Sequence, residues 1–386
     1  SIYGTNGRLV FYRLNACPIS EKRFIMRKLR IALMGCGRIS ASYALVFPRL
    51  SDIAEFVCAI DIEEERAKAF AAPFGAAWGT RFEDLSDKNV DIVHLCLPHY
   101  LHAPAAIRAM EAGMHVLTEK PVSITLQDAD RMKTVSERTG KKLGVIFQTR
   151  YEESVQQLRR MIQDGAFGRI LSARSILTWS RPYSYYEGCD WKGTWDREGG
   201  GVLIDQAIHS IDRIRYMLGS EVEWIDGSIH NHYHDRIRVE DTAEAAIHFK
   251  NGCLYSLYAT NSYASDAPVF LEFQGEKGRC GLKQDIGFYE LDGSYTEIKP
   301  APAAESAAIP DYWGMGHYAQ IHDFYLSVCN DTPVSVDVTE GRRTLEIVKG
   351  IYYSSQRRER IYLPFEDTNY SDLNTSSVSA PPAFSI

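Results

Sequence analysis

Short apolar runs alternate with helical stretches through the first half of the chain. Strands are predicted at Leu29–Met34, Glu55–Ile60, Asp91–Leu97, His115–Thr118 and Leu143–Phe147. Between them Ala, Glu and Arg recur at helical spacing, which predicts helices over Glu63–Ala72, Ala103–Ala112 and Leu126–Thr139. Strands that alternate with helices favour a parallel sheet joined by crossover helices. Residues 29–150 are therefore expected to form a doubly wound α/β domain.

Strand-like stretches with period-two alternation begin at about Gly168. In Thr242–Phe249 every second residue is apolar, so one face of the strand would be buried and the other exposed. Further strands are predicted at Ile170–Trp179, Val222–His230, Cys253–Thr260, Val269–Gln274 and Arg279–Lys283, with turns at Asn251-Gly252 and Asp292-Gly293. Helices are predicted over Val202–Leu218, His317–Cys329 and Thr339–Gln356. Residues 151–366 are therefore expected to form an α+β domain on a large, mostly antiparallel open sheet.

The composition is that of a folded protein. Of 386 residues, 45% are hydrophobic and 24% are charged, and 43 Lys and Arg stand against 50 Asp and Glu, a net charge of −7. An acidic chain repels phosphate backbones and anionic lipid, so neither nucleic acid nor a membrane surface is expected as a partner. No stretch approaches the roughly 18 apolar residues of a membrane span.

The two terminal segments and the cysteine pattern indicate the cellular compartment of the protein. Met26 stands directly before the first predicted strand, so residues 1–28 are expected to be an extension, and they lack the apolar core of a signal peptide. Residues 367–386, rich in Ser, Pro and Asn, are expected to be a weakly ordered tail. The eight cysteines form no CxxC pair, which is typical of reduced thiols. These features predict a cytoplasmic protein.

A glycine-rich loop follows the first predicted strand. In Gly35-Cys36-Gly37-Arg38-Ile39-Ser40, the first glycine permits a tight turn and the second allows a pyrophosphate to approach the backbone at a helix start. Asp61 ends the second strand, 26 residues after Gly35, where an acidic residue would bind ribose hydroxyls. Ile62 and three glutamates follow, with no Arg to receive a 2′-phosphate. The loop predicts a dinucleotide site that prefers NAD over NADP; a purely structural glycine turn is the alternative.

Two further motifs lie at the carboxyl ends of strands. Leu97-Pro98-His99-Tyr100-Leu101-His102 follows the third predicted strand, and Glu119-Lys120-Pro121 follows the fourth. An open α/β sheet binds its ligand at this edge. Both segments are therefore expected beside the nucleotide.

Taken together, these motifs resemble the glucose-fructose oxidoreductase / inositol dehydrogenase / MocA (Gfo/Idh/MocA) family. The resemblance covers residues 29 to about 363, including Gly113 to Pro121 and the glycines at 199–201 that lead into Asp205 and His209. It implies an N-terminal Rossmann domain, NAD as cofactor, a polyol, sugar or glycoside as substrate, and catalysis by Lys120, Asp205 and His209. The cofactor contacts expected are Gly35, Gly37, Arg38, Ile39, Asp61, Ile62, Leu97, Pro98, His102, Glu119, Lys120, Gln148, Trp191 and Lys192. The substrate contacts expected are Tyr151, Trp179, Tyr186, Trp195, Asp205, His209 and His317. At position 192 the family has Arg.

The residue types at the three catalytic positions suit alcohol oxidation. Asp205 and His209 are four apart in a helical stretch and so share one face. His209 can take the hydroxyl proton, Lys120 can stabilise the developing alkoxide, and Asp205 can orient the imidazole or hold a substrate hydroxyl. A structural Asp–His pair is the alternative.

Aromatic residues are dense between positions 179 and 195. The segment holds six of them, Trp179, Tyr183, Tyr185, Tyr186, Trp191 and Trp195. Such rings can stack on a sugar or an aromatic aglycone, or they can simply pack a long loop onto the sheet.

Three histidines alternate at His230, His232 and His234, a pattern that can indicate zinc. Successive side chains on one strand face lie about 7 Å apart, too far for three imidazoles to share one ion. No metal site is predicted, and the stretch is interpreted as a polar loop or edge strand.

The sequence thus predicts an NAD-dependent oxidoreductase that oxidises a secondary hydroxyl of a sugar, glycoside or cyclitol to a ketone, or runs the reverse. Two alternatives stay open: a redox-neutral enzyme that holds NAD tightly and cleaves or isomerises glycosides through a 3-keto intermediate, and a non-catalytic NAD(H) sensor. The exposed face of the second sheet suggests oligomerisation. The family resemblance implies a homodimer or homotetramer through that face.

Overall fold

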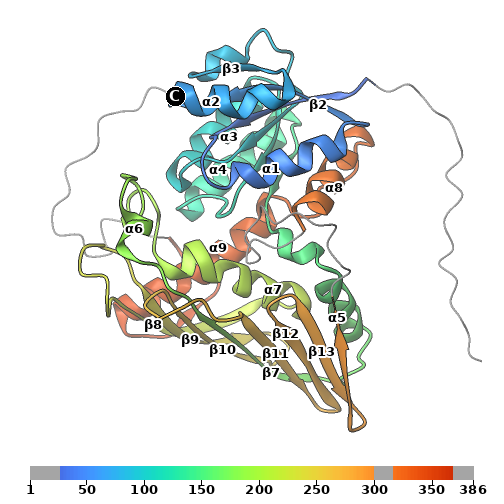
Figure 1. Ribbon diagram of the computed structural model, residues 1–386. Coiled ribbons are helices and arrows are strands. Elements are labelled where there is room, and N and C mark those ends of the chain that lie inside the picture. Colours follow the sequence, from blue (N-terminus) through green and yellow to red (C-terminus); the bar gives the residue numbers. More distant parts are fainter. Residues whose placement is uncertain (1–26, 300–315, 368–386) are drawn as a thin grey trace, which may run out of the picture.

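The computed structural model describes residues 27–299 and 316–367, which form two sheets with helices between and around them (Figure 1). The predicted extension and tail lie almost entirely outside the described residues. The first sheet has six parallel strands in the order β3-β2-β1-β4-β5-β6. Its strands are β1 Leu29–Met34, β2 Ala54–Ile60, β3 Ala77–Gly79, β4 Ile92–Leu95, β5 His115–Thr118 and β6 Leu143–Val145. The predicted doubly wound domain is confirmed, and only β3, three residues without periodicity, was missed.

Helices cover both faces of this sheet. They are α1 Ser40–Val46, α2 Glu64–Ala71, α3 His102–Glu111 and α4 Leu126–Thr139. Because β1 lies inside the sheet with helices on both sides, its residues from Ile31 to Met34 are all buried, which explains the continuous apolar run. The strand order reverses between β1 and β4, so the loops after these strands diverge and leave the crevice in which such sheets bind ligands.

The second sheet has nine strands in the order β14-β13-β12-β11-β7-β10-β9-β8-β15. Its strands are β7 Ile170–Thr178, β8 Val222–His230, β9 Thr242–Phe249, β10 Leu254–Thr260, β11 Phe270–Gly275, β12 Gly278–Lys283, β13 Ile286–Leu291, β14 Ser294–Ile298 and β15 Ile361–Tyr362. All neighbours are antiparallel except β7 and β10, which confirms the mostly antiparallel sheet. The predicted Asp292-Gly293 turn joins β13 to β14, two strands that the sequence pattern did not reveal.

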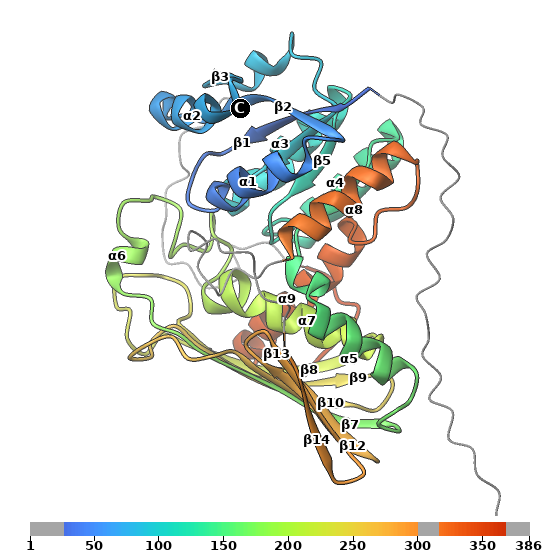
Figure 2. The same ribbon diagram turned by 45° about the vertical axis from the view of Figure 1, so that its right-hand side comes forward.

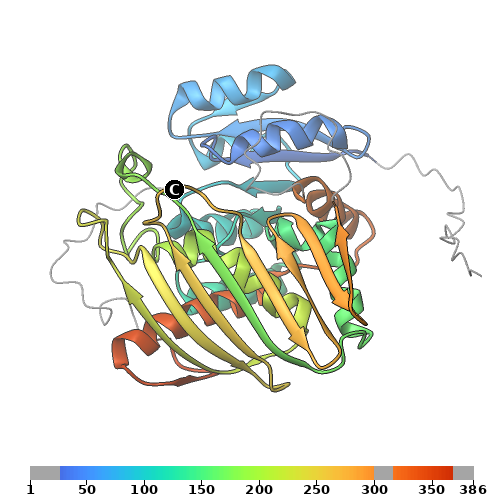
Figure 3. The same cartoon turned by 60° about the horizontal axis from the view of Figure 1, so that its bottom comes forward.

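Three helices, α5 Glu153–Gln163, α7 Ile208–Leu218 and α9 Val338–Arg357, lie on one face of the second sheet, between it and the first domain (Figures 1 and 2). The other face is open (Figure 3). The alternation in β10 follows from this arrangement: Tyr255 and Leu257 are buried under the helices, while Leu254 and Tyr258 point outward.

Helix α8, His317–Cys329, packs on the first domain rather than on the second. Tyr325 contacts His94 of β4 through a hydrogen bond of 2.8 Å. Gln320 accepts from the Phe147 amide at 3.0 Å and donates to the Val145 carbonyl at 2.8 Å. The chain therefore returns to the first domain after residue 316. The single boundary predicted at residue 150 was wrong in this respect, because helical periodicity does not say which apolar surface a helix will cover.

A buried ionic cluster joins the end of the first domain to α7 and α9. The Arg150 guanidinium donates to both carboxylate oxygens of Asp212, at 2.7 and 2.6 Å, and to Glu340 at 2.9 Å. Arg215 donates to the same oxygen of Glu340 at 2.5 Å. Burial alone would raise the pKa of Glu340, but Arg215 and Arg150 lower it from 4.5 to about 2. The cluster fixes the helix that carries His209.

Replacing Glu340 with Gln should destabilise the fold. A carboxyl pKa lowered from 4.5 to about 2 corresponds to roughly 3 kcal/mol of unfolding free energy, present above pH 4.5 and lost as the pH falls toward 2. Urea denaturation at pH 7 should show this loss for Glu340→Gln and no comparable loss for Glu137→Gln on the exposed side of α4. The deficit should shrink below pH 4.5. A deficit that stays constant with pH would indicate lost packing rather than lost charge.

Candidate active site

The glycine-rich loop leaves β1 at the crevice. Gly35 has φ +92, and a Cβ there would lie 2.2 Å from the Cys96 carbonyl oxygen, so only glycine fits. Gly37 is exposed, and a Cβ on it would meet nothing within 4 Å. The loop therefore presents open backbone where a phosphate group can approach. Arg38 follows, also exposed, with its guanidinium 5.0 Å from the centre of the Tyr185 ring in the second domain.

Asp61 ties the glycine loop to the end of β2. Its carboxylate accepts from the Cys36 amide at 2.7 Å and from the Glu63 amide at 2.8 Å. Each oxygen keeps a further lone pair that a ribose hydroxyl can use. Ile62, next to it, is 76% exposed, an unusual position for a large apolar side chain. The pair offers one polar and one apolar contact to an adenosine.

His102 and Glu119, both predicted to contact the cofactor, instead contact other protein groups and hold the loops after β4 and β5 in place. The buried His102 ring lies 2.7 Å from the Pro121 carbonyl and 2.9 Å from the Leu97 carbonyl, and so joins the loops after β4 and β5. The buried Glu119 accepts from the Tyr43 hydroxyl at 2.9 Å and lies 3.6 Å from His317 at the start of α8. These side chains bind the protein itself and place Leu97, Pro98 and Lys120 at the crevice.

Lys120 and Asp205, both predicted to be catalytic, meet between the two domains. The Lys120 ammonium donates to Asp205 Oδ1 at 3.0 Å and to its main-chain carbonyl at 2.5 Å. Asp205 lies in a π-helical turn, η6 (Leu203–Ala207), directly before α7. Such turns are frequent at functional sites.

The glycine run before this turn allows the close packing beneath it. A Cβ on Gly200 would lie 1.9 Å from the Tyr352 hydroxyl, and one on Gly201 would lie 1.8 Å from the Glu240 carbonyl oxygen. The Gly201 amide donates to the Glu240 carboxylate at 2.8 Å. Larger residues at these positions would displace the turn that carries Asp205.

A second ammonium binds the same carboxylate. Lys192 Nζ lies 2.9 Å from Asp205 Oδ2, which also accepts from the Tyr185 hydroxyl at 2.6 Å and from Gln206 at 2.7 Å. Burial would raise the pKa of Asp205, but Lys192 and Lys120 hold it well below its usual range, so the carboxylate is ionised. The sequence assigned Lys192 to the cofactor, placed Tyr185 among rings that stack on a sugar or pack the loop, and gave no role to Gln206. Only the folded loop brings these three residues to Asp205.

Behind Lys192 lies Glu198, whose carboxylate is 3.5 Å from Lys192 Nζ. Burial raises the pKa of Glu198 to about 8, although Lys192 acts in the opposite direction. Two ammonium groups, Lys120 and Lys192, contact the one carboxylate of Asp205.

His209 lies on α7 with its ring 6.0 Å from that of Phe147. Burial, and then the charges of Lys120 and Arg213, hold the pKa of His209 well below its usual range, so the ring is neutral. Its Nδ1 is buried and has no hydrogen-bond partner among the described residues. Asp205 makes no hydrogen bond or ion pair with His209 within the same part of the chain. The predicted orientation of the imidazole by Asp205 is therefore not seen, because two ammonium groups occupy the carboxylate.

The aromatic segment from 179 to 195 mainly packs the loop. Trp179 and Trp195 are each 8% exposed, and their indole N–H groups donate to the Ala267 and Arg238 carbonyls. Tyr186 is also buried. Trp191 is half-buried, with its ring 4.9 Å from that of His99. A role of these rings in substrate binding stays a prediction.

The remaining predicted contacts lie around α8. Tyr151 donates its hydroxyl to Asp323 at 2.7 Å, and Gln148 is buried one turn earlier in the chain. His317 is buried beside Glu119, with its ring 6.0 Å from that of Tyr43. Their contact with a ligand also stays a prediction.

The three alternating histidines have separate surroundings. His230 ends β8 and lies 2.9 Å from Glu244, and its ring stacks on His232 at 5.0 Å. His234 is buried between Asp241 and the Arg181 carbonyl. No group of three His, Cys, Asp or Glu residues able to hold a metal occurs in residues 27–299 and 316–367. None of the described helices is long and apolar enough to cross a bilayer.

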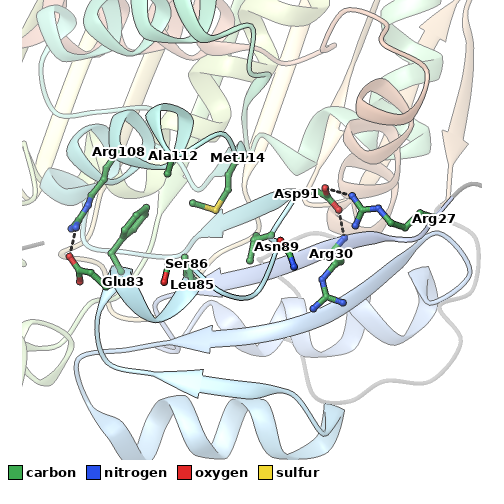
Figure 4. A pocket seen from close by; sticks show the side chains of 12 residues that line it. Arg27, Arg30, Glu83, Leu85, Ser86, Asn89, Asp91, Arg108, Ala112 and Met114 are labelled. Atoms are coloured by element: carbon green, nitrogen blue, oxygen red, sulfur yellow. Dashed lines mark hydrogen bonds and ion pairs between the residues drawn. The ribbon is translucent and has the colours of Figure 1, made fainter.

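A separate pocket of about 1040 Å³ lies at the opposite, amino-terminal edge of the first sheet (Figure 4). Its charged groups already pair with one another: Arg27 and the Arg30 amide bind Asp91, at 2.6 and 2.7 Å, and Arg108 binds Glu83. The active-site loops leave the other ends of these strands, so this pocket contributes nothing to them.

Two family models match the chain. The oxidoreductase family with an NAD-binding Rossmann fold matches residues 29–147, and the GFO/IDH/MocA C-terminal domain matches residues 155–280. The chain belongs to the Gfo/Idh/MocA oxidoreductase family. The resemblance stated from the motifs is confirmed, and so are the Rossmann domain and NAD as its cofactor.

Similar proteins of this family act on sugars and cyclitols. The chain is 28% identical to the myo-inositol 2-dehydrogenase of Thermotoga maritima, over 65% of this chain and 74% of that protein. It is 25% identical to the D-glucoside 3-dehydrogenase of Escherichia coli, over 87% and 97%. The WlbA dehydrogenase of Bordetella pertussis, solved with NADH and UDP-GlcNAcA, is 29% identical, with a TM-score of 0.77 over 88% of this chain and 100% of that one. The chain is thus an NAD-binding oxidoreductase of a sugar and cyclitol dehydrogenase family.

Replacing Asp61 with Ala should weaken NADH binding roughly tenfold or more, because the ribose would lose an acceptor and the Cys36 amide its partner. Fluorescence titration of NADH measures this. Glu64→Ala, at the exposed start of α2, is the matched control and should bind NADH normally. Unchanged affinity in Asp61→Ala would remove Asp61 from the nucleotide site.

Proposed function

We propose that this protein is an NAD-dependent dehydrogenase that oxidises a secondary hydroxyl of a sugar, glycoside or cyclitol to a ketone, or catalyses the reverse reaction. The observation that carries the proposal is the Lys120–Asp205 pair, which joins the nucleotide domain to the second domain at the crevice. Its surroundings hold two ammonium groups and neutral imidazoles. Alcohol oxidation needs these two features, a stabiliser for an alkoxide and an acceptor for its proton.

The cofactor would be held at the carboxyl edge of the first sheet. Gly37, Asp61 and Ile62 offer open backbone, a carboxylate and an exposed apolar side chain. Arg38, Ile39, Leu97, Pro98 and Trp191 border the same crevice. When bound, NAD accepts the hydride that leaves the carbinol carbon. Residues of the chain stabilise the reacting oxygen and accept the hydroxyl proton.

Lys120 is proposed to donate a hydrogen bond to the reacting oxygen and to stabilise the negative charge that develops there. Asp205 fixes the ammonium in place through two contacts. A neutral imidazole takes the hydroxyl proton, and His209 is the one that the family resemblance implies. The low pKa of His209 keeps its ring unprotonated across the neutral range, with both the charge-free form and a lone pair available.

The redox-neutral alternative has one observation in its favour. A relative is named a D-glucoside 3-dehydrogenase, and oxidation at C3 gives the 3-keto sugar that such an enzyme would use. NAD that stays bound through dialysis, with turnover of a glycoside in the absence of added cofactor, would favour this alternative. NADH that accumulates in solution would favour the dehydrogenase.

Replacing Lys120 with Met should lower kcat roughly 100- to 1000-fold and leave NADH affinity nearly unchanged, because the ammonium acts on the alkoxide. NADH absorbance in the presence of inositols, free sugars and aryl glycosides provides the assay. Lys133→Met, on the exposed side of α4, is the control. A kcat near that of the wild type would exclude Lys120 from the reaction, and no turnover of any polyol by the wild type would contradict the proposed function.

We also propose that the open face of the second sheet joins two copies of the chain. Leu254, Tyr258 and Ile176 are 39%, 42% and 39% exposed on its central strands. Beside them runs a ladder of alternating charges across four strands, Arg174, Glu272, Arg279 and Glu290. An apolar centre beside alternating charges suits a surface that packs against the same surface of a second copy, related by a twofold axis.

Ile176→Asp should convert the oligomer to monomers, because it places a charge in the centre of this face. Light scattering after gel filtration measures the mass. Leu326→Asp, with a similarly exposed side chain on α8, should leave the mass unchanged. A wild-type protein that is monomeric at micromolar concentration would contradict the proposed interface.

A further inference from the structure

A second imidazole, that of His99, lies against the Lys120–Asp205 pair. His99 lies in the loop after β4, next to Pro98. Its side chain is 5% exposed. Its ring is held between Trp191, at 4.9 Å, and His102, at 5.9 Å. The sequence motif that contains His99 predicted no role for it.

The protonation of the His99 ring follows from its hydrogen bond. Nδ1 lies 2.8 Å from the Glu198 carbonyl oxygen. A carbonyl can only accept, so Nδ1 carries a proton and donates it. A neutral imidazole has a single N–H, and Nε2 is then a hydrogen-bond acceptor. Burial lowers the pKa of His99 well below its usual range, which agrees with the neutral form.

The accepting nitrogen faces another acceptor. Nε2 lies 3.9 Å from Asp205 Oδ1, the same oxygen that binds the Lys120 ammonium at 3.0 Å. A neutral ring with its lone pair toward a carboxylate gains nothing from this contact. A hydrogen-bond donor placed at Nε2 would bind there. In an alcohol dehydrogenase the donor at hand is a substrate hydroxyl.

We propose that His99 Nε2 accepts a hydrogen bond from the substrate hydroxyl adjacent to the one that is oxidised, so that the enzyme selects vicinal diols. The proposal rests on the proposed function. Lys120 binds the reacting oxygen, and His99 binds its neighbour, since both groups surround one carboxylate oxygen. Sugars and cyclitols carry such adjacent hydroxyl pairs, whereas isolated alcohols do not. His99 is thus a specificity-determining residue.

The tautomer can be tested without knowing the substrate. NMR spectra of the protein labelled with ¹⁵N-histidine are recorded at pH 7. The ring resonances that are absent from the spectrum of His99→Gln belong to His99. A protonated Nδ1 and an unprotonated Nε2 are expected. Protonation at Nε2, in either a neutral or a charged ring, would overturn the proposal.

The role in specificity is tested with matched substrates. The probes are methyl β-D-glucopyranoside with its 2-deoxy and 4-deoxy analogues, and myo-inositol with a monodeoxy inositol. Wild-type enzyme should lose roughly 10- to 100-fold in kcat/KM on one deoxy analogue, because Nε2 is left unsatisfied. His99→Leu should lose a similar factor on the parent substrate and little further on that analogue. His99→Gln, whose side-chain oxygen can replace Nε2, should regain part of the discrimination.

The outcomes separate the two proposals. If His99→Leu binds NADH normally but slows the parent and the deoxy analogues by the same factor, His99 does not contact the adjacent hydroxyl. If the wild type oxidises none of the probes, the proposed function is at fault, and the tautomer measurement still decides the state of His99.

Discussion

The carboxylate of Asp205 is the interaction on which the site depends. It lies between the domains with its side chain 10% exposed, one oxygen on Lys120 from the nucleotide domain and the other on Lys192 from the aromatic loop. A buried carboxylate without such partners would take up a proton. With two ammonium groups it stays ionised, and it holds the Lys120 ammonium at the crevice, where the proposed reaction needs a hydrogen-bond donor for an alkoxide. The same contact fixes how far the two domains stand apart at the crevice.

Packing far from the reacting groups keeps this carboxylate in place. The glycines at 199–201 let the chain pass against Tyr352 of α9 and against Glu240, which precedes β9, where any side chain would clash. Helix α7, which follows, is held to the end of the first domain by the bidentate contact of Arg150 with Asp212. Helix α9 also lies between the two sheets. These contacts therefore position Asp205 and His209 relative to the first domain.

Two neutral imidazoles border the Lys120–Asp205 pair, and their surroundings differ. His99 is oriented by a backbone carbonyl and held between two rings, whereas His209 has no hydrogen-bond partner for Nδ1 within the described residues. An oriented imidazole suits recognition of one hydroxyl in a defined position. A ring without a fixed partner can turn to meet a proton donor. The difference between them supports the two separate roles proposed for histidine in this site.

The sequence alone determined the architecture and the nucleotide site, because both depend on local order. Strand–helix alternation fixes a parallel sheet, and a glycine loop after β1 with Asp61 after β2 must then meet at one edge. Lys120, Asp205 and His209 were predicted to be catalytic from a motif resemblance, and the four-residue spacing of Asp205 and His209 agreed with it. What only the tertiary structure decided is which groups share Asp205, where α8 packs, and what the His99 ring contacts. These depend on contacts between residues far apart in the chain, such as Lys192 against Asp205 or His99 against Glu198, and hydrophobic periodicity carries no information about such distances.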